Sequence, residues 1–324
     1  MKRQSYTSDL TDEQWQKTNP SKFGFIIPNY NGIEMLNEYL PGIDKVAGEA
    51  DVLVVDDASY DNSVQVLRDN FPGIRVIVRE KNGGFSAAVN DGIRATGSDF
   101  VVLLNSDVEV TPGFLEPIIP LFDDKSVFAV SPRIILPKRG GIDEGAKTGF
   151  WHHGLFFTDQ RSDIKEVSPV LYATGCAAVY RRSMLEALGG FDEAYSPFYW
   201  EDADLGYRAW KRGWKSLYQP SGTVYHQHSA SISKIKSDVT QRIRTRNSLF
   251  FIWRNIEDRD MLRTHSRWLP LILARKWLAG DLAFIRGWRD AYAHRKEAIE
   301  ARRQDSEHRV LSDREIFSIN GINF

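Results

Sequence analysis

The sequence predicts an α/β fold with a mixed, mostly parallel central sheet flanked by helices and a C-terminal helical extension. Up to about residue 130, short runs of β-branched residues alternate with stretches of helical pattern, which is the arrangement of βαβ units around a parallel sheet. The runs are apolar throughout rather than alternately apolar and polar, as strands covered on both faces are. Polar residues follow every run, which places the candidate functional side chains at the same end of each strand.

The elements of this part follow from the apolar runs and the turn residues between them. The expected strands are residues 23–27, 51–55, 74–78 and 99–104. Asp61 is expected to cap a helix that continues to Asn70 and is closed by Pro72-Gly73. A second short helix is expected from Gly84 to Arg94.

Further along the chain, helical patterns replace the strands. Residues 183–188 form a helix that Gly189-Gly190 ends, and a helix opens at Glu201-Asp202, where an Asp204–Arg208 pair at i,i+4 supports it. Residues 239–255 and 260–303 read as amphipathic helices. We therefore divide the chain into a polar extension (1–22), a main domain (23–235, with halves 23–110 and 111–235) and a basic helical region (236–324).

Composition is that of an ordinary globular protein, with 324 residues of which 42% are hydrophobic and 26% charged. The single Cys176 excludes an intramolecular disulfide and favours a reducing compartment. The first residues lack the apolar core of a signal peptide, and the apolar stretch 268–288 is interrupted by four charged residues, so no membrane span is predicted. A cytoplasmic protein is expected.

A near-zero net charge hides a basic segment. Residues 234–303 hold 17 Lys and Arg against 8 Asp and Glu, whereas the whole chain has 42 against 43. The segment also carries several large aromatic residues: Phe250, Phe251, Trp253, Trp268, Trp277 and Trp288. This combination fits contact with an anionic membrane at the inner face of the cell membrane, or with anionic groups of a substrate. A solvated basic helix face is the plainer alternative.

Ligands of open α/β sheets bind beyond the carboxyl ends of the strands, and in this sequence those positions are polar. The segments that follow the four expected strands are Pro28-Asn29-Tyr30-Asn31-Gly32, Asp56-Asp57-Ala58-Ser59-Tyr60-Asp61, Arg79-Glu80-Lys81-Asn82-Gly83-Gly84 and Asn105-Ser106-Asp107. Each segment alone is explained by turn chemistry. Four together at the same edge of a sheet indicate a binding site.

The ordered series IIPNYNG, VVDDASYDNS, EKNGGFSAAVNDGI, LLNSDVEV, GGFDEAYSPFYWEDADLGYR and YHQHSAS resembles the family-2 glycosyltransferases of the GT-A fold. Within that family it is most similar to the bacterial rhamnosyl- and galactofuranosyltransferases. The resemblance covers about residues 23–255. It implies an inverting enzyme that moves a sugar from a nucleoside-diphosphate donor to a hydroxyl acceptor, with a divalent metal ion on the diphosphate. A growing cell-surface polysaccharide, free or lipid-linked, is the acceptor that the resemblance suggests.

The resemblance also implies donor-binding residues. Tyr30 would lie against the base while Pro28 fixes the backbone of the same loop, and Asp57 matches the carboxylate that accepts a hydrogen bond from a pyrimidine N3–H. Asn82 and Gly84 match a loop that closes over the nucleotide, where the missing Cβ of glycine lets the backbone approach a ligand. A turn proline, a core tyrosine and an Asx turn are the structural alternatives.

Asn105 and Asp107 occupy the two ends of the family's Asp-X-Asp motif and are expected to hold the donor. Mg²⁺ or Mn²⁺ needs few protein carboxylates when it also bridges substrate phosphates, so Asp107 is the expected metal ligand. Asn105 stands where the family has an aspartate, and this removes one charge. His226 resembles a histidine that some relatives use as a further metal ligand, with His228 as a competing candidate.

Asp202 and Glu201 match the acidic pair of the family. Asp202 would take the proton of the acceptor hydroxyl as that hydroxyl attacks the anomeric carbon from the face opposite the diphosphate. Glu201 would orient Asp202 or raise its basicity through like-charge repulsion. Acidic residues also favour helix N-termini whatever the function.

Other classes fit the sequence less well. A nicotinamide dehydrogenase lacks support because no G-x-G-x-x-G follows the first strand. A sugar nucleotidyltransferase would need an early basic glycine-rich loop, and no nucleic-acid-binding motif accompanies the basic segment. A catalytically degenerate nucleotide-sugar-binding scaffold gains from Asn105. Cys176 is expected to be a small buried hydrophobe without a histidine partner.

Overall fold

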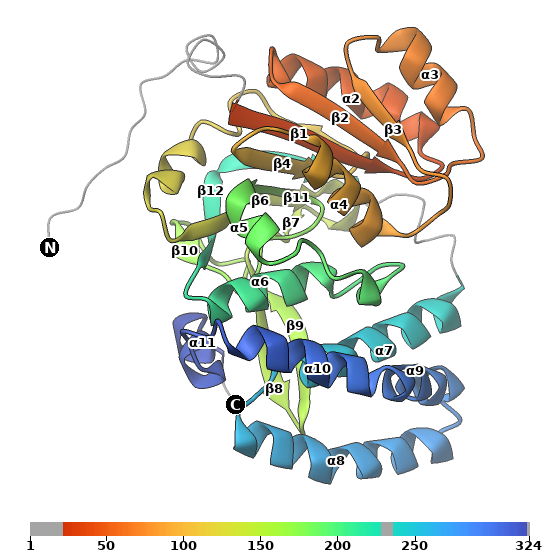
Figure 1. Ribbon diagram of the computed structural model, residues 1–324, viewed down its shortest axis with the longest axis vertical. Helices are drawn as coiled ribbons and strands as arrows, with labels where there is room; N and C mark the ends of the chain where they lie inside the picture. The colour runs from red at the N-terminus through yellow and green to blue at the C-terminus, as the bar shows by residue number, and fades with distance from the viewer. Residues whose placement is uncertain (1–21, 228–235, 323–324) are drawn as a thin grey trace, which may run out of the picture.

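The computed structural model describes residues 22–227 and 236–322. Its centre is a mixed sheet of ten strands whose main path runs β10-β12-β6-β11-β4-β1-β2-β3 (Figure 1). The four strands expected from the apolar runs lie side by side and parallel: β1 (Phe23–Asn29), β2 (Asp51–Asp56), β3 (Arg75–Val78) and β4 (Phe100–Leu104). β11 (Ala177–Arg181) joins β4 antiparallel. The predicted mixed, mostly parallel α/β fold is confirmed.

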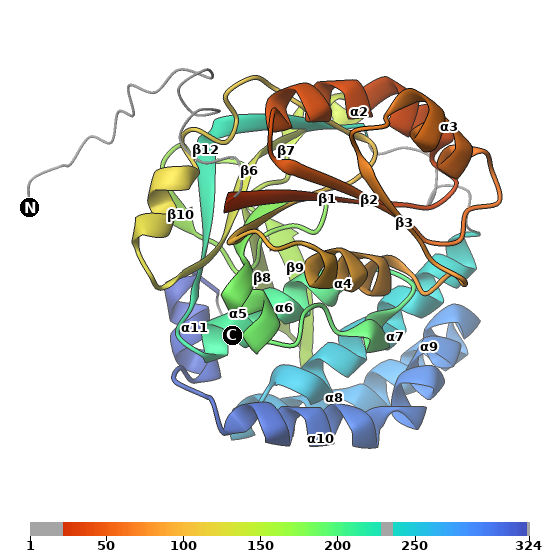
Figure 2. The same ribbon diagram turned by 45° about the horizontal axis from the view of Figure 1, so that its top comes forward.

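Alternate residues of the central strands enter cores on opposite faces of the sheet, which explains their continuous apolar character. Phe25 and Ile27 of β1 pack in the core that α2 (Ile33–Ala47) covers, and Ile26 between them packs in the core that α4 (Phe85–Ala95) covers. Figure 2 shows α2 and α3 (Ser63–Asn70) on one side of the parallel strands and α4 on the other.

The start of α3 differs from the expectation. Asn62 rather than Asp61 holds the cap position. Asp61 still binds helix donors, since its Oδ1 accepts from the Ser63 amide at 3.0 Å and its Oδ2 from the Ile33 amide of α2 at 3.1 Å. One carboxylate, one residue before the cap position of α3, thus accepts from the first residue of each of two helices.

The second half of the main domain completes the sheet. Its strands are β5 (Val108–Val110), β6 (Val127–Leu136), β7 (Ile142–Asp143), β8 (Lys147–His152), β9 (Leu155–Gln160), β10 (Ser168–Pro169) and β12 (Lys215–His226). Helix α5 (Arg182–Ala187) ends before Gly189-Gly190, as expected. Helix α6 (Glu201–Lys211) contains the expected Asp204–Arg208 ion pair, at 2.6 Å and fully buried.

The described part of the basic region is helical, as expected. It comprises α7 (Ser237–Asn255), α8 (Arg259–Leu278), α9 (Leu282–Ala293), α10 (Arg295–Ser306) and α11 (Asp313–Ile319). The hairpin β8–β9 extends from the sheet region down to these helices (Figure 1), where Phe156 stacks on Phe251 at 5.2 Å. No described helix is both long enough and apolar enough to span a bilayer.

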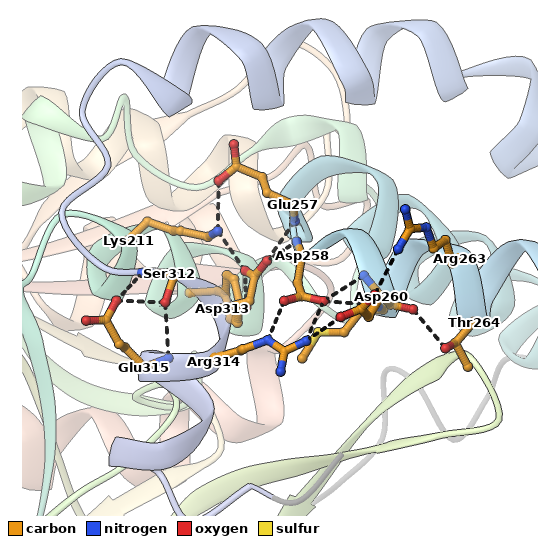
Figure 3. A network of polar contacts seen from close by, with 12 residues as sticks. Lys211, Glu257, Asp258, Asp260, Arg263, Thr264, Ser312, Asp313, Arg314 and Glu315 are labelled. Carbon is orange, nitrogen blue, oxygen red and sulfur yellow. Dashed lines mark hydrogen bonds and ion pairs between the residues drawn. The ribbon is translucent and has the colours of Figure 1, made fainter.

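A buried carboxylate anchors the last helix to the main domain (Figure 3). Asp313 at the start of α11 accepts hydrogen bonds from the Tyr207 hydroxyl at 2.6 Å and from the Glu257 and Asp258 amides at 2.7 Å each. Lys211 of α6 forms an ion pair with it at 2.6 Å. The C-terminal helices and the helix that opens at Glu201 are therefore joined through one polar network.

Candidate active site

The carboxyl edge of the parallel strands is held together by buried polar groups. Asn29 at the end of β1 donates from Nδ2 to Asp56 Oδ2 at the end of β2, at 2.9 Å, and both residues are buried. The Asp57 amide donates to the Asn29 carbonyl oxygen at 2.8 Å. These bonds fix the loops after β1 and β2 against each other, at the edge where the sequence predicts the nucleotide.

Asp57 ties the glycine loop to this edge. Its Oδ1 accepts from the Gly83 amide at 2.9 Å and from Arg79 Nη1, and its Oδ2 accepts from the Gly84 amide at 2.8 Å. Gly84 has φ +85°, and an added Cβ there would lie 2.9 Å from Pro197 Cα, so a larger residue does not fit. Asp57 Oδ2 accepts one bond from the described residues and retains a lone pair for a ligand.

The other predicted donor-binding residues surround the same loops. Tyr30 is 40% exposed and meets the ring of Tyr60 edge-on, with centroids 6.2 Å apart. Pro28 is half-buried in β1, and Asn82 is exposed on the loop before α4. Their contacts with a base remain predictions. Tyr60 is an aromatic neighbour that the sequence analysis did not single out.

Asp107 and His226, 119 positions apart in the sequence, meet at one point. Strand β12 pairs antiparallel with β5, and this register places His226 opposite Val108. His226 Nε2 lies 3.3 Å from Asp107 Oδ1, and the Gln227 amide donates to the Asp107 carbonyl oxygen at 3.1 Å. The two expected metal ligands thus face each other. His228 lies outside the described residues.

Two further residues complete this cluster, and sequence reasoning missed both. His226 Nδ1 lies 2.9 Å from Glu144 Oε1, and the ligand atoms of Glu144, Cys176 and His226 lie within 4.8 Å of one another. The expectation that Cys176 has no histidine partner is therefore wrong: the β4–β11 pairing places Cys176, just before β11, at the same edge as β12.

The charges in the cluster shift its pKa values. Burial lowers the pKa of His226, but Cys176, Asp107 and Glu144 raise it by more, so the net pKa lies well above the ordinary value. Burial raises the pKa of Glu144, and the neighbouring His226 and Lys147 outweigh it and bring that pKa to about 2. Because a metal ion binds the neutral imidazole, cation binding at His226 would compete with protonation of its ring.

Asn105 begins the tight turn that presents Asp107. Its amide donates to the Cys176 carbonyl oxygen at 2.8 Å, and its carbonyl oxygen accepts from the Val108 amide at 3.2 Å. Its side-chain amide makes no hydrogen bond with another residue in the described ranges. The backbone of this turn thus links the Asp107 side of the cluster to Cys176.

Asp202 lies at the start of α6, close to the cluster. Its Oδ2 accepts from the Gly175 amide at 3.1 Å and its Oδ1 from the Ala203 amide at 2.8 Å. Burial raises the pKa of Asp202 despite these bonds. Gly175 adjoins Cys176 in the chain, so Asp202 and the Asp107–His226 pair are positioned by adjoining backbone.

Glu201 is buried, and its Oε2 has no hydrogen-bond partner among the described residues. Burial and, after it, the neighbouring Asp202 hold the pKa of Glu201 well above its ordinary value. This favours a protonated Glu201 beside an ionised Asp202. Like-charge repulsion from Glu201 requires its charged form, so the expected orienting role agrees better with the structure.

Helix α7 holds the segment that leads into α6. Tyr199 and Trp200 adopt positive φ of 73° and 78°, which is costly for non-glycine residues. Asn247, fully buried, donates from Nδ2 to the carbonyl oxygens of Tyr195 at 2.8 Å, Phe198 at 3.0 Å and Tyr199 at 2.7 Å. One amide thus holds the backbone that aims Asp202.

Comparison with known proteins settles the family. Residues 25–189, half of the chain, match the profile of Glycosyl transferase family 2. The chain belongs to glycosyl transferase family 2. This match includes the segments with Asp57 and Asp107, and Asp202 and His226 follow it along the chain.

Curated relatives of this glycosyltransferase come from bacteria. The N-acetylglucosaminyl-diphospho-decaprenol L-rhamnosyltransferase of Mycobacterium tuberculosis is 31% identical over 211 residues, which cover 56% of this chain and 68% of the relative. The O-antigen chain rhamnosyltransferase WbaN of Salmonella anatum is 28% identical over 212 residues, covering 64% and 66%.

Solved structures confirm the GT-A fold of the family-2 chain. GalNAc-T7 with UDP, GalNAc and Mn²⁺ superposes with a TM-score of 0.63 at 16% identity, covering 92% of this chain and 56% of that one. Staphylococcus aureus TarS 1–349 with UDP-GlcNAc gives 0.57 at 17% identity, covering 89% of each.

The ligand atoms that this glycosyltransferase brings together fit a divalent cation. Asp107 offers a carboxylate oxygen and His226 an imidazole nitrogen at one point, a combination suited to Mn²⁺, whereas Mg²⁺ prefers oxygen ligands. Glu144 on the opposite ring nitrogen would fix the His226 tautomer that leaves Nε2 free to bind.

Proposed function

We propose that this glycosyltransferase transfers a sugar, with inversion and with a divalent metal, from a nucleoside-diphosphate donor (UDP- or dTDP-sugar) to a hydroxyl of a glycan or lipid-linked glycan in cell-surface polysaccharide synthesis. One observation carries the proposal: Asp107, His226 and Asp202 converge at the carboxyl edge of the sheet through the Gly175–Cys176 backbone.

The donor would bind across the loops after β1, β2 and β3. Asp57 Oδ2, with its remaining lone pair, would accept from the N3–H of a pyrimidine, and the exposed ring of Tyr30 would lie against the base. Gly84 would let the loop backbone approach the nucleotide. Asn82 and Asn105 offer amides for further polar contacts.

Asp107 and His226 would hold Mg²⁺ or Mn²⁺ against the diphosphate. When bound, the cation supplies positive charge that stabilises the departing diphosphate. The protein's own part is to fix the two ligand atoms at one point and to set the tautomer of His226 through Glu144.

Asp202 would act as the general base. Its carboxylate takes the proton of the acceptor hydroxyl while that oxygen bonds to the anomeric carbon and the carbon–oxygen bond to the diphosphate breaks. A single displacement inverts the anomeric configuration. Gly175 and Ala203 amides hold the carboxylate in place, and a protonated Glu201 would orient it without competing for the proton.

The bacterial relatives support this acceptor class. One bears a name that places its sugar on a diphospho-decaprenol lipid, and another acts on an O-antigen chain. We expect a cytoplasmic enzyme that works in peripheral contact with the inner face of the cell membrane, where such acceptors are built.

A second candidate is a degenerate nucleotide-sugar-binding scaffold. Asn105 favours it, because an asparagine in place of the family's aspartate leaves one carboxylate fewer at the expected metal site. Incubation with a panel of nucleoside-diphosphate sugars and Mn²⁺ or Mg²⁺ separates the two. The enzyme releases nucleoside diphosphate from one donor, and with acceptor present Asp202→Asn sharply lowers that release. Binding of a donor without release or transfer, in folded protein, would support the scaffold instead.

A further inference from the structure

Helix α8 exposes a surface that nothing in the proposed chemistry uses. Large apolar side chains stand out from it and from the first residue of α9: Leu271 is 61% exposed, Trp277 65%, Leu278 86% and Leu282 49%. Figure 1 shows α8 at the end of the molecule farthest from α2 and α3. We define the outer face as Arg267, Leu271, Arg275, Trp277, Leu278 and Leu282.

The spacing puts apolar and basic residues on one side of this helix. Positions 267, 271, 275 and 278 recur every three to four residues and so share a face, and all four are exposed. The buried residues of the helix, Met261 and His265, lie in its first half. Within the described ranges, Arg267 and Arg275 form no ion pair, whereas Arg263 pairs with Asp260 and Lys276 with Asp281. The two arginines of the outer face are thus available to a partner.

We propose that the outer face of α8 docks on an anionic phospholipid bilayer. Leucine and tryptophan side chains enter the boundary between headgroups and acyl chains, and arginines meet the headgroup phosphates, as in interfacial amphipathic helices. A second copy of this chain fits less well, because a symmetric contact would bring the same unpaired arginines together. Charge complementarity therefore selects the membrane.

Docking through this face would fix the distance between the bilayer surface and the active site. The β8–β9 hairpin starts at Lys147, beside Glu144 of the cluster, and its turn reaches α8, where His153 stacks on Trp268 at 4.1 Å. A strand of this length spans about 20 Å. The inference rests on the proposed function in one point: the hairpin would lie along the path of a lipid-linked acceptor from the bilayer to the active site.

Sedimentation with vesicles tests the proposal. We expect the protein to sediment with mixed phosphatidylcholine and phosphatidylglycerol vesicles at low salt, and not with phosphatidylcholine alone. Arg267→Gln with Arg275→Gln should lower the partition coefficient about 30-fold. Leu271→Ser with Leu278→Ser should lower it about 10-fold or more. Trp277→Ser, at an exposed helix end, gives a third variant that does not threaten folding.

The matched control is Arg68→Gln with Arg303→Gln, which removes the same charge from exposed positions on α3 and α10. Retained binding by this control, with loss in the α8 variants, supports the docking face. Equal loss in the control, or no binding of the parent to anionic vesicles, overturns it, as does an α8-dependent dimer in sedimentation velocity. Donor release without acceptor reports on the proposed function separately, since the α8 variants should leave it unchanged.

Discussion

At the residue scale, the most informative contact is the one between Glu144 and His226. Asp107 approaches one ring nitrogen at 3.3 Å and Glu144 the other at 2.9 Å. A carboxylate on the far nitrogen of a metal-binding histidine fixes its tautomer and raises its basicity. If His226 binds the metal as proposed, Glu144 acts as a positioning residue that contributes no atom to the expected ligand pair.

Glu144→Gln should weaken Mn²⁺ binding about 10- to 100-fold, because the amide holds the imidazole less firmly and carries no charge. Titration calorimetry with Mn²⁺ measures this directly. Glu109→Gln, an exposed change on the neighbouring β5, should leave the affinity unchanged. Equal affinities in the parent and the Glu144 variant would contradict the positioning role.

Asp202 should impose an acid limb on the pH profile of transfer. A base works only when ionised, and burial raises the pKa of Asp202, so activity should fall at a higher pH than an ordinary aspartate would allow. Asp202→Asn should lower kcat about 100- to 10,000-fold and abolish this limb.

Glu201→Gln distinguishes the two carboxylates in the same assay. Because burial and, after it, Asp202 raise the pKa of Glu201 well above its ordinary value, Glu201 is not the expected base and this variant should retain the acid limb. If the limb instead disappears in Glu201→Gln and survives in Asp202→Asn, the roles are reversed.

Sequence motifs predicted the site residues that stand at the ends of strands. They missed the residues that reach the site only because distant strands pair in the sheet. Asp107 and His226 were expected as ligands, and β5–β12 pairing places them together. Glu144 precedes a short hairpin and matches no motif, and Cys176 reads as an apolar position. Their proximity depends on strand order in the sheet, which local pattern does not encode.

At the element scale, α7 controls the entry into α6. The pattern of residues 239–255 predicted a helix, and the apolar runs predicted the strands that the structure shows as β1 to β4. The β8–β9 hairpin and the three-residue β5 escaped prediction because short strands with mixed burial carry little periodicity.

Asn247→Ala should lower both stability and turnover. The change leaves the carbonyl oxygens of Tyr195, Phe198 and Tyr199 without their shared donor, and each unsatisfied buried carbonyl costs about 1–3 kcal/mol. The segment that aims Asp202 would relax, so kcat should fall while the Kd for donor stays close to that of the parent.

Thermal unfolding and steady-state kinetics measure the two effects. Ser248→Ala, on the next position of α7, serves as the control, since among the described residues the Ser248 hydroxyl donates only to the Thr245 carbonyl oxygen within the helix. A parent-like kcat in Asn247→Ala would show that the segment holds its shape without this amide.

At the scale of the whole molecule, the main domain and the C-terminal helices follow each other in the order expected from the sequence and form one connected structure. The parallel strands end at the proposed nucleotide edge, α6 and β12 carry the proposed base and metal ligand, and the C-terminal helices share a core with β9 and α6. Helix α8, which carries the proposed docking face, lies at the end of the molecule farthest from α2 and α3 (Figure 1). The overall order was predictable from the motifs, but the shared core was not.

The measurement that tests the central claim most directly is calorimetric binding of UDP, GDP and dTDP with and without Mn²⁺, using the parent and Asp107→Ala. The account predicts tight binding of one diphosphate that requires Mn²⁺ and is lost in the folded Asp107 variant. Binding that is equally strong without the metal, or that survives Asp107→Ala, would contradict the metal-bridged donor site at the carboxyl edge of the sheet.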